Sequence, residues 1–218
     1  MKPYPLSHGN IHEGISPQEW IAQTQAHRAS YKRLADRISH AYPLTDGRVL
    51  DYGCGNGLLL SIMAEHWPST VLLDGMDIDH ELIDWANNQF ATDRLHYLHA
   101  EKLPPQSINY DLVISTFVSH HWHDPEAYFQ DLLHYVKPGG SIYVEDINPQ
   151  GFYSLLHASR LYYLLFHPAK SDFFGYRQSR QSAYSSSRLE NTMRKIAGID
   201  YRLETGHGRV MIHLQKQR

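Results

Sequence analysis

A carboxylate and three glycines are the residues of this chain whose types and spacing point most directly to chemistry. They stand in residues 49–57, which read Val-Leu-Asp-Tyr-Gly-Cys-Gly-Asn-Gly. Glycines lack a Cβ atom, so the backbone can turn sharply after a strand and approach a ligand, and a following helix offers unpaired N–H groups. Asp51 adds a negative charge at the same point. The segment therefore predicts a ligand site that favours a cation.

Two features separate this turn from one that binds a dinucleotide. Asp51 would repel a diphosphate held beside Gly53, and the dinucleotide fingerprint needs a third glycine where Leu58 stands. Nicotinamide and flavin cofactors are therefore disfavoured. Cys54 is the only cysteine of the chain, so no intrachain disulfide is expected. We interpret Cys54 as a small residue in a crowded turn rather than as a nucleophile.

A second carboxylate follows the next apolar run. Asp77 stands about twenty residues beyond the turn, at the distance where a carboxylate can accept two hydrogen bonds from a ribose diol. Asp79 and Asp74 are alternatives for this role. Asp79 fits better as the N-cap of the helix that follows, because its side chain can accept hydrogen bonds from the first turn. Asp77 is therefore our candidate for a ribose contact.

Alternating strands and helices must position these groups. Apolar runs predict strands that end near Asp51 and that span 71–77, 95–98, 110–116 and 141–147. Helical spacing predicts helices at 16–40, 58–65, 81–90, 125–136 and 185–197. Lys-Pro-Gly-Gly at 137–140 is expected to end the fourth of these helices, and 200–205 with 209–215 to form a terminal hairpin. This alternation predicts an α/β fold with a doubly wound, parallel sheet.

Length and composition predict one globular domain. The chain has 218 residues, of which 42% are hydrophobic and 20% charged. We divide it into an N-terminal arm and lid helix (1–44), a cofactor-binding core (45–150), an aromatic helical insertion (151–184) and a C-terminal helix and hairpin (185–218). The net charge of −3 argues against a general nucleic-acid binder. No apolar run reaches the ~18 residues of a membrane span and no signal-peptide pattern is present, so a cytoplasmic protein is expected.

Six segments, in this order, resemble class I S-adenosylmethionine-dependent methyltransferases. They are the turn at 49–57, Gly-Met-Asp-Ile-Asp at 75–79, Ala-Glu-Lys-Leu-Pro at 100–104, Tyr-Asp-Leu-Val-Ile-Ser at 110–115, His-His-Trp-His-Asp-Pro-Glu at 120–126 and Lys-Pro-Gly-Gly at 137–140. The resemblance is close over 45–148 and is nearest to the small-molecule branch that includes ubiquinone and menaquinone biosynthesis enzymes. It implies a Rossmann-like seven-stranded sheet, mostly parallel with a C-terminal antiparallel hairpin, and S-adenosyl-L-methionine as the cofactor.

The resemblance also implies which residues hold that cofactor. The methionine portion would lie among Asp51, Gly53, Cys54, Gly55, Asn56, Gly57 and Ser115, and the adenosine portion among Asp77, Ile78, His99, Ala100 and Glu101. His99 stands where the family often has an aspartate that accepts from the adenine amino group. Either His99 accepts through a neutral ring nitrogen, or Glu101 takes over this contact.

The chemistry that the resemblance implies is an in-line displacement at a methyl group, which depends mainly on orientation and exclusion of water. A base is needed only if the acceptor must lose a proton. His121 is our candidate for the base, because it follows the fourth strand and histidine exchanges protons near neutral pH. A packing or hydrogen-bonding role for His121 is an equal alternative. The neighbouring His120, His123 and Asp124 are too close in sequence to converge on one ion, so no metal is expected.

Aromatic residues gather beyond the fifth predicted strand, at 152–180, where they suit a flat, apolar acceptor. From Arg160 to Lys195 seven basic residues stand against two acids, so the acceptor can also carry a negative charge. Alternatives for this stretch are a protein core, a membrane-facing surface, a dimer interface or, for its charges, a solvated face. The candidate acceptor-binding residues are Trp20, Tyr31, His121, Tyr153, Tyr162 and Arg177.

The sequence therefore predicts a methyltransferase of the EC 2.1.1 class that acts on a small molecule. Two alternatives keep the same fold: an enzyme that uses the cofactor for cyclisation or rearrangement, and a cofactor-binding regulatory module. A nucleic-acid methyltransferase is disfavoured, because Ser-Thr-Phe-Val stands at 115–118 in place of an Asn-Pro-Pro-Tyr-like tetrapeptide. The expected partner is a small molecule, with no nucleic acid and no membrane span, and a homodimer is left open.

Overall fold

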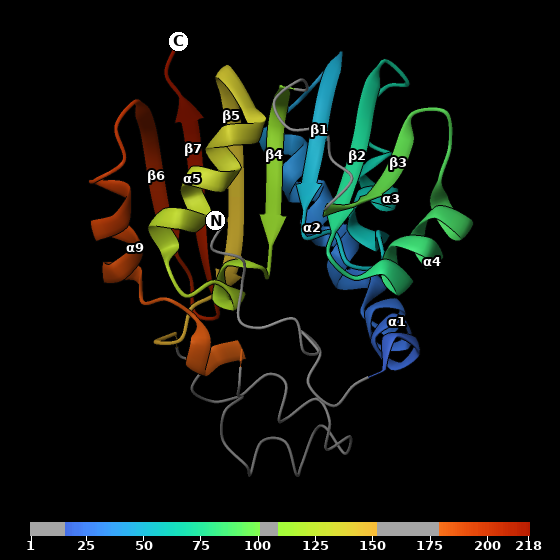
Figure 1. Cartoon of the computed structure of the whole chain (residues 1–218), viewed down its shortest axis with the longest axis horizontal. Helices are drawn as coiled ribbons and strands as arrows, with labels where there is room; N and C mark the ends of the chain where they lie inside the picture. Colours follow the sequence, from blue (N-terminus) through green and yellow to red (C-terminus); the bar gives the residue numbers. More distant parts are fainter. Residues whose placement is uncertain (1–15, 101–108, 152–178) are drawn as a thin grey trace.

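A seven-stranded sheet forms the centre of the computed structural model, which describes residues 16–100, 109–151 and 179–218 (Figure 1). The strand order is β3-β2-β1-β4-β5-β7-β6. The strands are β1 (Gly47–Tyr52), β2 (Val71–Asp77), β3 (Leu95–His99), β4 (Tyr110–Thr116), β5 (Val136–Ile147), β6 (Ile199–Thr205) and β7 (Arg209–Lys216). β1 to β5 pair in parallel, whereas β7 pairs antiparallel with both β5 and β6. The predicted Rossmann-like sheet with an antiparallel hairpin is confirmed.

Helices cover both faces of this sheet. They are α1 (Pro17–Ala26), α2 (Arg28–Ala41), α3 (Leu58–Met63), α4 (His80–Phe90), α5 (Pro125–Tyr135) and α9 (Ser186–Met193), with a short 3-10 helix η2 at Ser119–His121. Apolar side chains of α2, α3 and α4 pack on one face, and those of α5 and α9 on the other (Figure 1). The strands between them are buried on both faces, which explains their continuous apolar runs.

The order of the strands reverses between β1 and β4, which are neighbours in the sheet but not in the chain. Asp51 lies in register with Ile114 of β4 on one side and with Gly75 of β2 on the other. In open α/β sheets, ligands bind outside the carboxyl ends of strands at such a point. The carboxyl ends of β1, β2 and β4 point downward in Figure 1, toward the end where α1 lies.

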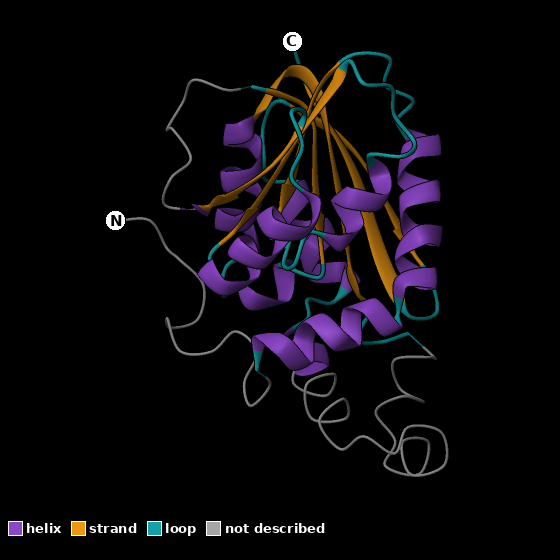
Figure 2. Ribbon diagram, turned by 90° about the vertical axis from the view of Figure 1, so that its right-hand side faces the viewer, coloured by secondary structure: helices purple, strands orange, loops and turns teal. Residues whose placement is uncertain are grey.

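The N-terminal helix differs from the prediction. Ser16 forms the expected capping box with Glu19, but the single helix expected to reach about residue 40 is divided into α1 and α2 at His27. His27 leaves the helical conformation at φ −95° and ψ 12°, and its ring nitrogen Nδ1 lies 2.8 Å from the carbonyl oxygen of Gln23. A side chain that bonds a carbonyl one turn earlier competes with the helix, which accounts for the break. The break turns α1 across the end of the sheet (Figure 2).

The start of β5 also differs from the prediction. Lys-Pro-Gly-Gly was expected to end α5, but α5 ends at Tyr135 and β5 already begins at Val136. Val136 is extended, at φ −82° and ψ 137°, and Lys137 precedes Pro138, a position that disfavours a helical backbone. The pairing with β4 shifts register between Tyr110 and Leu112, so these residues form an irregular start of the strand. The other predicted elements agree with the structure to within a few residues.

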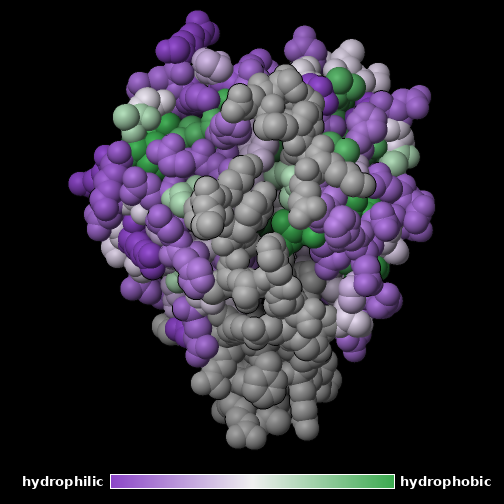
Figure 3. All heavy atoms as spheres, viewed as in Figure 1, coloured by the Kyte–Doolittle hydropathy of each residue, from purple (hydrophilic) through white to green (hydrophobic). Residues whose placement is uncertain are grey.

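The surface is mostly hydrophilic on the side seen in Figure 3. Among the described residues, Leu72 is the one large hydrophobic side chain that counts as exposed. No helix in the described part of the chain combines the length and the apolar character that crossing a membrane requires. The predicted N-terminal arm at 1–15 and most of the predicted aromatic insertion lie outside the described residues.

Candidate active site

The glycine turn follows β1 and leads into α3. Gly53, Gly55 and Gly57 have φ angles of 78°, 53° and 74°, a region that L side chains rarely adopt. The backbone N–H groups of Gly53 and Cys54 both donate to the carbonyl oxygen of Met76, at 2.7 and 2.9 Å, which fixes the turn against the end of β2. Among the described residues, a Cβ atom added at Gly55 would meet one neighbour within 4 Å, the ring nitrogen of Trp20 at 3.6 Å. The turn therefore leaves room beside Gly55 for a ligand to approach the backbone.

Asp51 is the most unusual group of the site. Its side chain is buried, with 1% of the residue exposed, and neither carboxylate oxygen has a hydrogen-bond partner among the described residues. Burial, and then repulsion from Asp77, raise the pKa of Asp51 from 3.8 to about 7. A buried carboxylate without partners is unfavourable unless a cation or a donor is added. The site therefore fits a ligand that carries a positive charge, such as the ammonium group of an amino acid.

Asp77 lies at the end of β2, as the sequence predicted. Its two oxygens accept from the backbone N–H groups of Gly55 at 2.8 Å and of Asp79 at 3.0 Å. These contacts hold the carboxylate beside the glycine turn, and a carboxylate oxygen can accept from more than one donor. Asp79 caps α4 instead, because its side chain accepts from the N–H groups of Glu81 and Leu82. This arrangement agrees with the assignment of Asp77, rather than Asp79, to the ribose.

His99 lies next to Asp77, at the end of β3. The two residues are in register across the sheet, and the Nε2 atom of His99 lies 2.7 Å from the carbonyl oxygen of Ile78. This contact requires the proton on Nε2, so a neutral His99 ring carries its acceptor on Nδ1. The ring of His80 stacks on that of His99, with centroids 3.4 Å apart. His99, Ile78 and the half-buried Ala100 thus lie close together near the ends of β2 and β3, while Glu101 lies outside the described residues, and the predicted contacts of these residues with adenine stay a prediction.

The helix α1 is tied to the glycine turn by a buried hydrogen bond. The side-chain amide of Asn56 donates to the hydroxyl of Thr24 at 2.5 Å, and both residues are buried. Trp20 of α1 stands over Gly55, and Tyr31 of α2 is close enough to Asp51 for that charge to act on it. Burial, and then Asp51, raise the pKa of Tyr31 to about 12. Both N-terminal helices therefore lie beside the glycine turn or Asp51, and their role as a lid over a cofactor stays a prediction.

Two of the predicted cofactor residues have clear structural contacts. Cys54 is buried, and burial followed by the charges of Asp77 and Asp51 raises the pKa of its thiol well above the usual value. The thiol is therefore neutral, which agrees with the interpretation of Cys54 as a small residue in the turn. Ser115 is fully buried and donates its hydroxyl to the carbonyl oxygen of Tyr52 at 2.9 Å, so it joins β4 to β1. Its predicted contact with the methionine portion stays a prediction.

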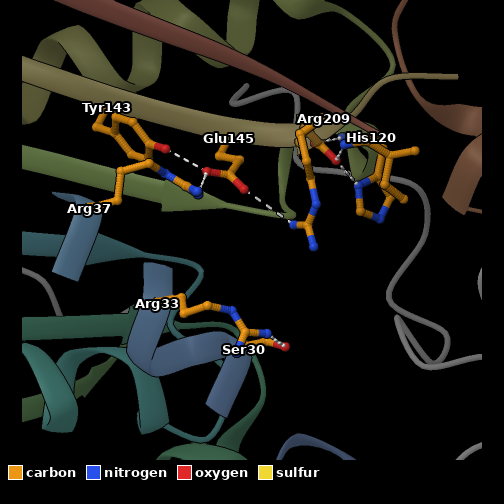
Figure 4. Close-up of polar contacts among 9 residues, drawn as sticks. Ser30, Arg33, Arg37, His120, Tyr143, Glu145 and Arg209 are labelled. Carbon is orange, nitrogen blue, oxygen red and sulfur yellow. Dashed lines mark hydrogen bonds and ion pairs between the residues drawn. The ribbon is translucent and has the colours of Figure 1, made fainter. Parts of the chain in front are cut away.

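A cavity of about 410 Å³ lies between α2, the carboxyl ends of β4 and β5, and the start of β7. Tyr31, Leu34 and Phe117 form its apolar wall. Its charged lining consists of Arg33, Arg37, Arg209 and Glu145, which Figure 4 shows together. Tyr31 links this cavity to the cofactor cleft, since it lines the cavity and also lies near Asp51. The cavity is therefore the candidate acceptor site, and of the residues predicted for the acceptor it contains Tyr31.

Sequence reasoning missed Asp146 and its contact with His120, both at the rim of the sheet. Asp146 is buried and accepts from the His120 backbone N–H at 3.0 Å, from its ring atom Nδ1 at 2.8 Å and from the hydroxyl of Ser119. Burial acts to raise the pKa of Asp146, but the charge and hydrogen bond of His120 hold it below its usual value. The contact fixes the His120 ring with Nδ1 toward the carboxylate, which leaves Nε2 on the other side of the ring.

His121, the predicted base, is half-buried beside His120, with ring centroids 4.1 Å apart. His121 was chosen as the candidate base from its position after the fourth strand. No sequence pattern indicates that a residue of this loop contacts Asp146 on β5. Tyr153, Tyr162 and Arg177, the other predicted acceptor residues, lie outside the described residues. Among the described residues no group of three or more His, Cys, Asp or Glu side chains is arranged to hold a metal ion.

Comparison with known sequences identifies relatives of one kind. A family model described as a methyltransferase domain matches residues 23–198. An uncharacterized methyltransferase from Mycobacterium bovis is 34% identical over 116 residues, which cover 52% of this chain and 56% of that protein. A ubiquinone biosynthesis O-methyltransferase from Coxiella burnetii is 29% identical over 115 residues, which cover 51% of this chain and 48% of that protein. The chain thus spans about half the length of the curated relatives it matches.

Solved structures share the fold over nearly the whole chain. The plantazolicin methyltransferase BpumL, in complex with a triazolic desmethylPZN analog and S-adenosylhomocysteine, has a TM-score of 0.73 and 15% identity, and the match covers 96% of this chain and 94% of that chain. An S-adenosylmethionine-dependent methyltransferase from Methanococcus maripaludis, described there as putative, has a TM-score of 0.71 and 19% identity over 99% of this chain and 97% of that chain. At these identities the similarity is one of fold.

Proposed function

We propose, on the premise that this chain belongs to the methyltransferase domain family, that it binds S-adenosylmethionine and transfers its methyl group to a small molecule. The membership confirms the resemblance to class I S-adenosylmethionine-dependent methyltransferases that the motifs indicated. The single observation that carries the proposal is Asp51, a buried carboxylate without a hydrogen-bond partner among the described residues, beside a glycine turn. The ammonium group of S-adenosylmethionine supplies the positive charge that this position lacks.

Different residues of the chain bind different parts of this cofactor. Asp51 and the turn at Gly53 to Gly57 hold its methionine portion, and Asp77 accepts from its ribose hydroxyls. Ile78, His99 and Ala100 border its adenine. When bound, the cofactor supplies a methyl group on a positively charged sulfur, which a nucleophile can displace. The protein contributes orientation and exclusion of water, for which the lid formed by α1 and α2 is suited.

The acceptor in this proposal is a small aromatic or lipophilic molecule that can carry a negative charge. It binds in the cavity lined by Tyr31, Leu34 and Phe117, of which Tyr31 also lies near Asp51. Two aromatic walls suit a flat ring. Where the accepting atom must lose a proton, His120 and His121 are the candidate bases. We favour His120, because Asp146 fixes its ring and can stabilise the charge that it gains.

Transfer of a labelled methyl group tests this proposal. The protein is incubated with methyl-labelled S-adenosylmethionine and an extract of the cells that express it, and the label is then measured in the small-molecule, protein and nucleic-acid fractions. We expect label in the small-molecule fraction, its loss in Asp51→Asn, and no change in Asp46→Asn, which alters an exposed carboxylate in the turn before β1. Label in protein or nucleic acid would overturn the assignment of the acceptor. S-adenosylmethionine that is bound but never consumed would instead favour a binding role.

A further inference from the structure

The charge of the acceptor cavity is unbalanced. Three arginines, Arg33, Arg37 and Arg209, line it together with one acid, Glu145. The positive side chains come from two different parts of the fold, since Arg33 and Arg37 belong to α2 and Arg209 begins β7. With Glu145 ionised, the three guanidinium groups exceed the carboxylate by two charges. A purely apolar acceptor would not explain why three arginines line the cavity, whereas an anionic one would.

Glu145 acts as a buried anchor for two of the arginines. Its side chain is 2% exposed and accepts from the guanidinium groups of Arg37 and of Arg209, the latter at 3.3 Å, and from the Tyr143 hydroxyl at 2.5 Å. The side chains of Arg37 and Arg209 remain 49% and 47% exposed. A guanidinium group has five N–H donors, so each keeps donors beyond its contact with Glu145. Glu145 therefore holds both groups in place without using up their hydrogen-bonding capacity.

Phe117 gives Arg209 a second support. The guanidinium carbon of Arg209 lies 4.2 Å from the centre of the Phe117 ring, a cation–π contact. Phe117 has a φ of 60°, and it is the one residue other than glycine with a positive φ in the described part of the chain. Its N–H donates to the carbonyl oxygen of Glu145 at 2.8 Å, which holds this unfavourable backbone in place. Strain of this kind persists where surrounding contacts enforce it, and it often marks a binding site.

Arg33 adds a third positive charge to the lining of the cavity. Its guanidinium group donates to the hydroxyl of Ser30 at 2.9 Å, and no carboxylate lies within 4 Å of it among the described residues (Figure 4). Arg33 is exposed, and therefore it can adjust to a ligand. Arg33 is thus an adjustable donor, in contrast to Arg37 and Arg209, which Glu145 fixes.

We infer that these arginines bind a carboxylate of the acceptor, so that the methyl acceptor is an organic acid whose ring or chain packs against Phe117 and Tyr31. Arginine pairs with carboxylates through two parallel hydrogen bonds, a geometry that also sets the direction of the bound molecule. The carboxylate would lie at the arginine end of the cavity, and the rest of the acceptor would extend toward Asp51 and the cofactor cleft. This inference rests on the proposed function and names the class of its substrate.

Binding of a matched acid and amide tests the inference. The probes are benzoate and benzamide, which have nearly the same shape but differ in charge, and binding is followed by NMR in the presence of S-adenosylhomocysteine. We expect benzoate to bind about tenfold or more tightly than benzamide, as is typical for hydrogen bonds to a charged group. Raising the ionic strength should weaken the binding of benzoate and leave that of benzamide unchanged.

Single substitutions test which arginines bind the carboxylate of benzoate. Arg33→Gln and Arg209→Gln should each weaken benzoate binding severalfold and leave benzamide binding unchanged, whereas Arg202→Gln, on the exposed side of β6, should change neither. Arg33 contacts Ser30, whereas Arg209 contacts both Glu145 and Phe117. Weaker binding in Arg33→Gln is therefore less open to explanation by misfolding than weaker binding in Arg209→Gln. Equal binding of the two probes, no binding of benzoate up to its solubility, or equal effects of all three variants would overturn the inference. Binding of S-adenosylhomocysteine is measured separately, and its loss would count against the proposed function instead.

Discussion

Asp51 is a carboxylate whose burial destabilises the ligand-free protein. Because the pKa of Asp51 is raised from 3.8 to about 7, the folded state keeps this proton at pH values where the unfolded state has lost it. The titration of Asp51 therefore leaves the free energy of unfolding highest below pH 3.8 and lowers it as the pH rises. Above a pH of about 7 the favourable contribution of the protonated Asp51 is lost. A shift of this size corresponds to about 4 kcal/mol. Ionised Asp51 therefore lowers the stability of the ligand-free protein, whereas it can pair with a positively charged ligand.

Replacing Asp51 by asparagine should therefore stabilise the ligand-free protein. At pH 8 the free energy of unfolding of Asp51→Asn should exceed that of the wild type by about 1–3 kcal/mol, since the buried amide still lacks partners. At pH 4 the gain should disappear, because Asp51 is then protonated. Urea unfolding at both pH values, with Asp46→Asn as control, measures the difference. A gain that does not depend on pH would contradict the assignment of the titrating group.

The ring orientation of His120 depends on its hydrogen bond with Asp146 on β5. With its ring fixed by Asp146, His120 should take the proton of an acceptor that must be deprotonated. His120→Gln should lower kcat by about 10²- to 10⁴-fold and leave the affinity for S-adenosylhomocysteine unchanged. Asp146→Asn should lower kcat less and alter its dependence on pH, as expected of a positioning residue.

The matched control for His120 is His134→Gln, which changes an exposed histidine near the end of α5. Steady-state kinetics of the three variants and of His121→Gln separate the two candidate bases. If His121→Gln loses kcat and His120→Gln does not, the base is the residue that sequence position alone suggested.

At the scale of secondary-structure elements, the hydrogen bond between Asn56 and Thr24 joins the lid to the glycine turn. Thr24→Val keeps the shape of the side chain and removes the hydroxyl, so the buried amide of Asn56 loses its acceptor. We expect the free energy of unfolding to fall by about 1–3 kcal/mol, and amide hydrogen exchange to become faster in α1. S-adenosylhomocysteine should slow exchange in α1 of the wild type more than in that of the variant.

Thr192→Val is the control for this experiment, because Thr192 is also buried and its hydroxyl, like that of Thr24, donates to a carbonyl of its own helix. Thr24 differs in that it also accepts from the Asn56 amide. If exchange in α1 is the same in Thr24→Val and in the wild type, with and without S-adenosylhomocysteine, this hydrogen bond does not hold the lid.

At the scale of the whole molecule, cofactor binding and folding are coupled. The site draws on β1, β2, β3 and α1, and the described elements share one sheet, so the protein should unfold in a single transition. S-adenosylhomocysteine at a concentration of ~100 Kd should stabilise it by about 2.7 kcal/mol. For a domain of this size the midpoint of thermal unfolding should then rise by about 5–10 °C. Calorimetry checks this, and two separate transitions of which one ignores the ligand would contradict it.

Local sequence signals predicted most of the fold and the places of two candidate cofactor residues in it. β2 and β4 follow their apolar runs residue for residue, and Asp51 and Asp77 lie where strand ends and glycines placed them. The break at His27 escaped prediction, because it depends on one side chain that competes for a carbonyl. The contacts of Asp146 with His120 and of Glu145 with Arg209 also escaped, since they join residues far apart in sequence. Pattern reasoning detects the periodicity of an element, but not which side chains two elements bring together.

The arginines around Glu145 have a consequence for how this protein can diverge. Apart from Ser115, the proposed cofactor contacts lie within one stretch, from Asp51 to Glu101, whereas the charged groups of the proposed acceptor cavity come from α2, β5 and β7. Substitutions at Arg33 or Arg209 can therefore change acceptor preference while the cofactor cradle stays intact. Selection can act on the two specificities separately, so that duplicated copies of such a gene could acquire new substrates without passing through forms that no longer bind the methyl donor.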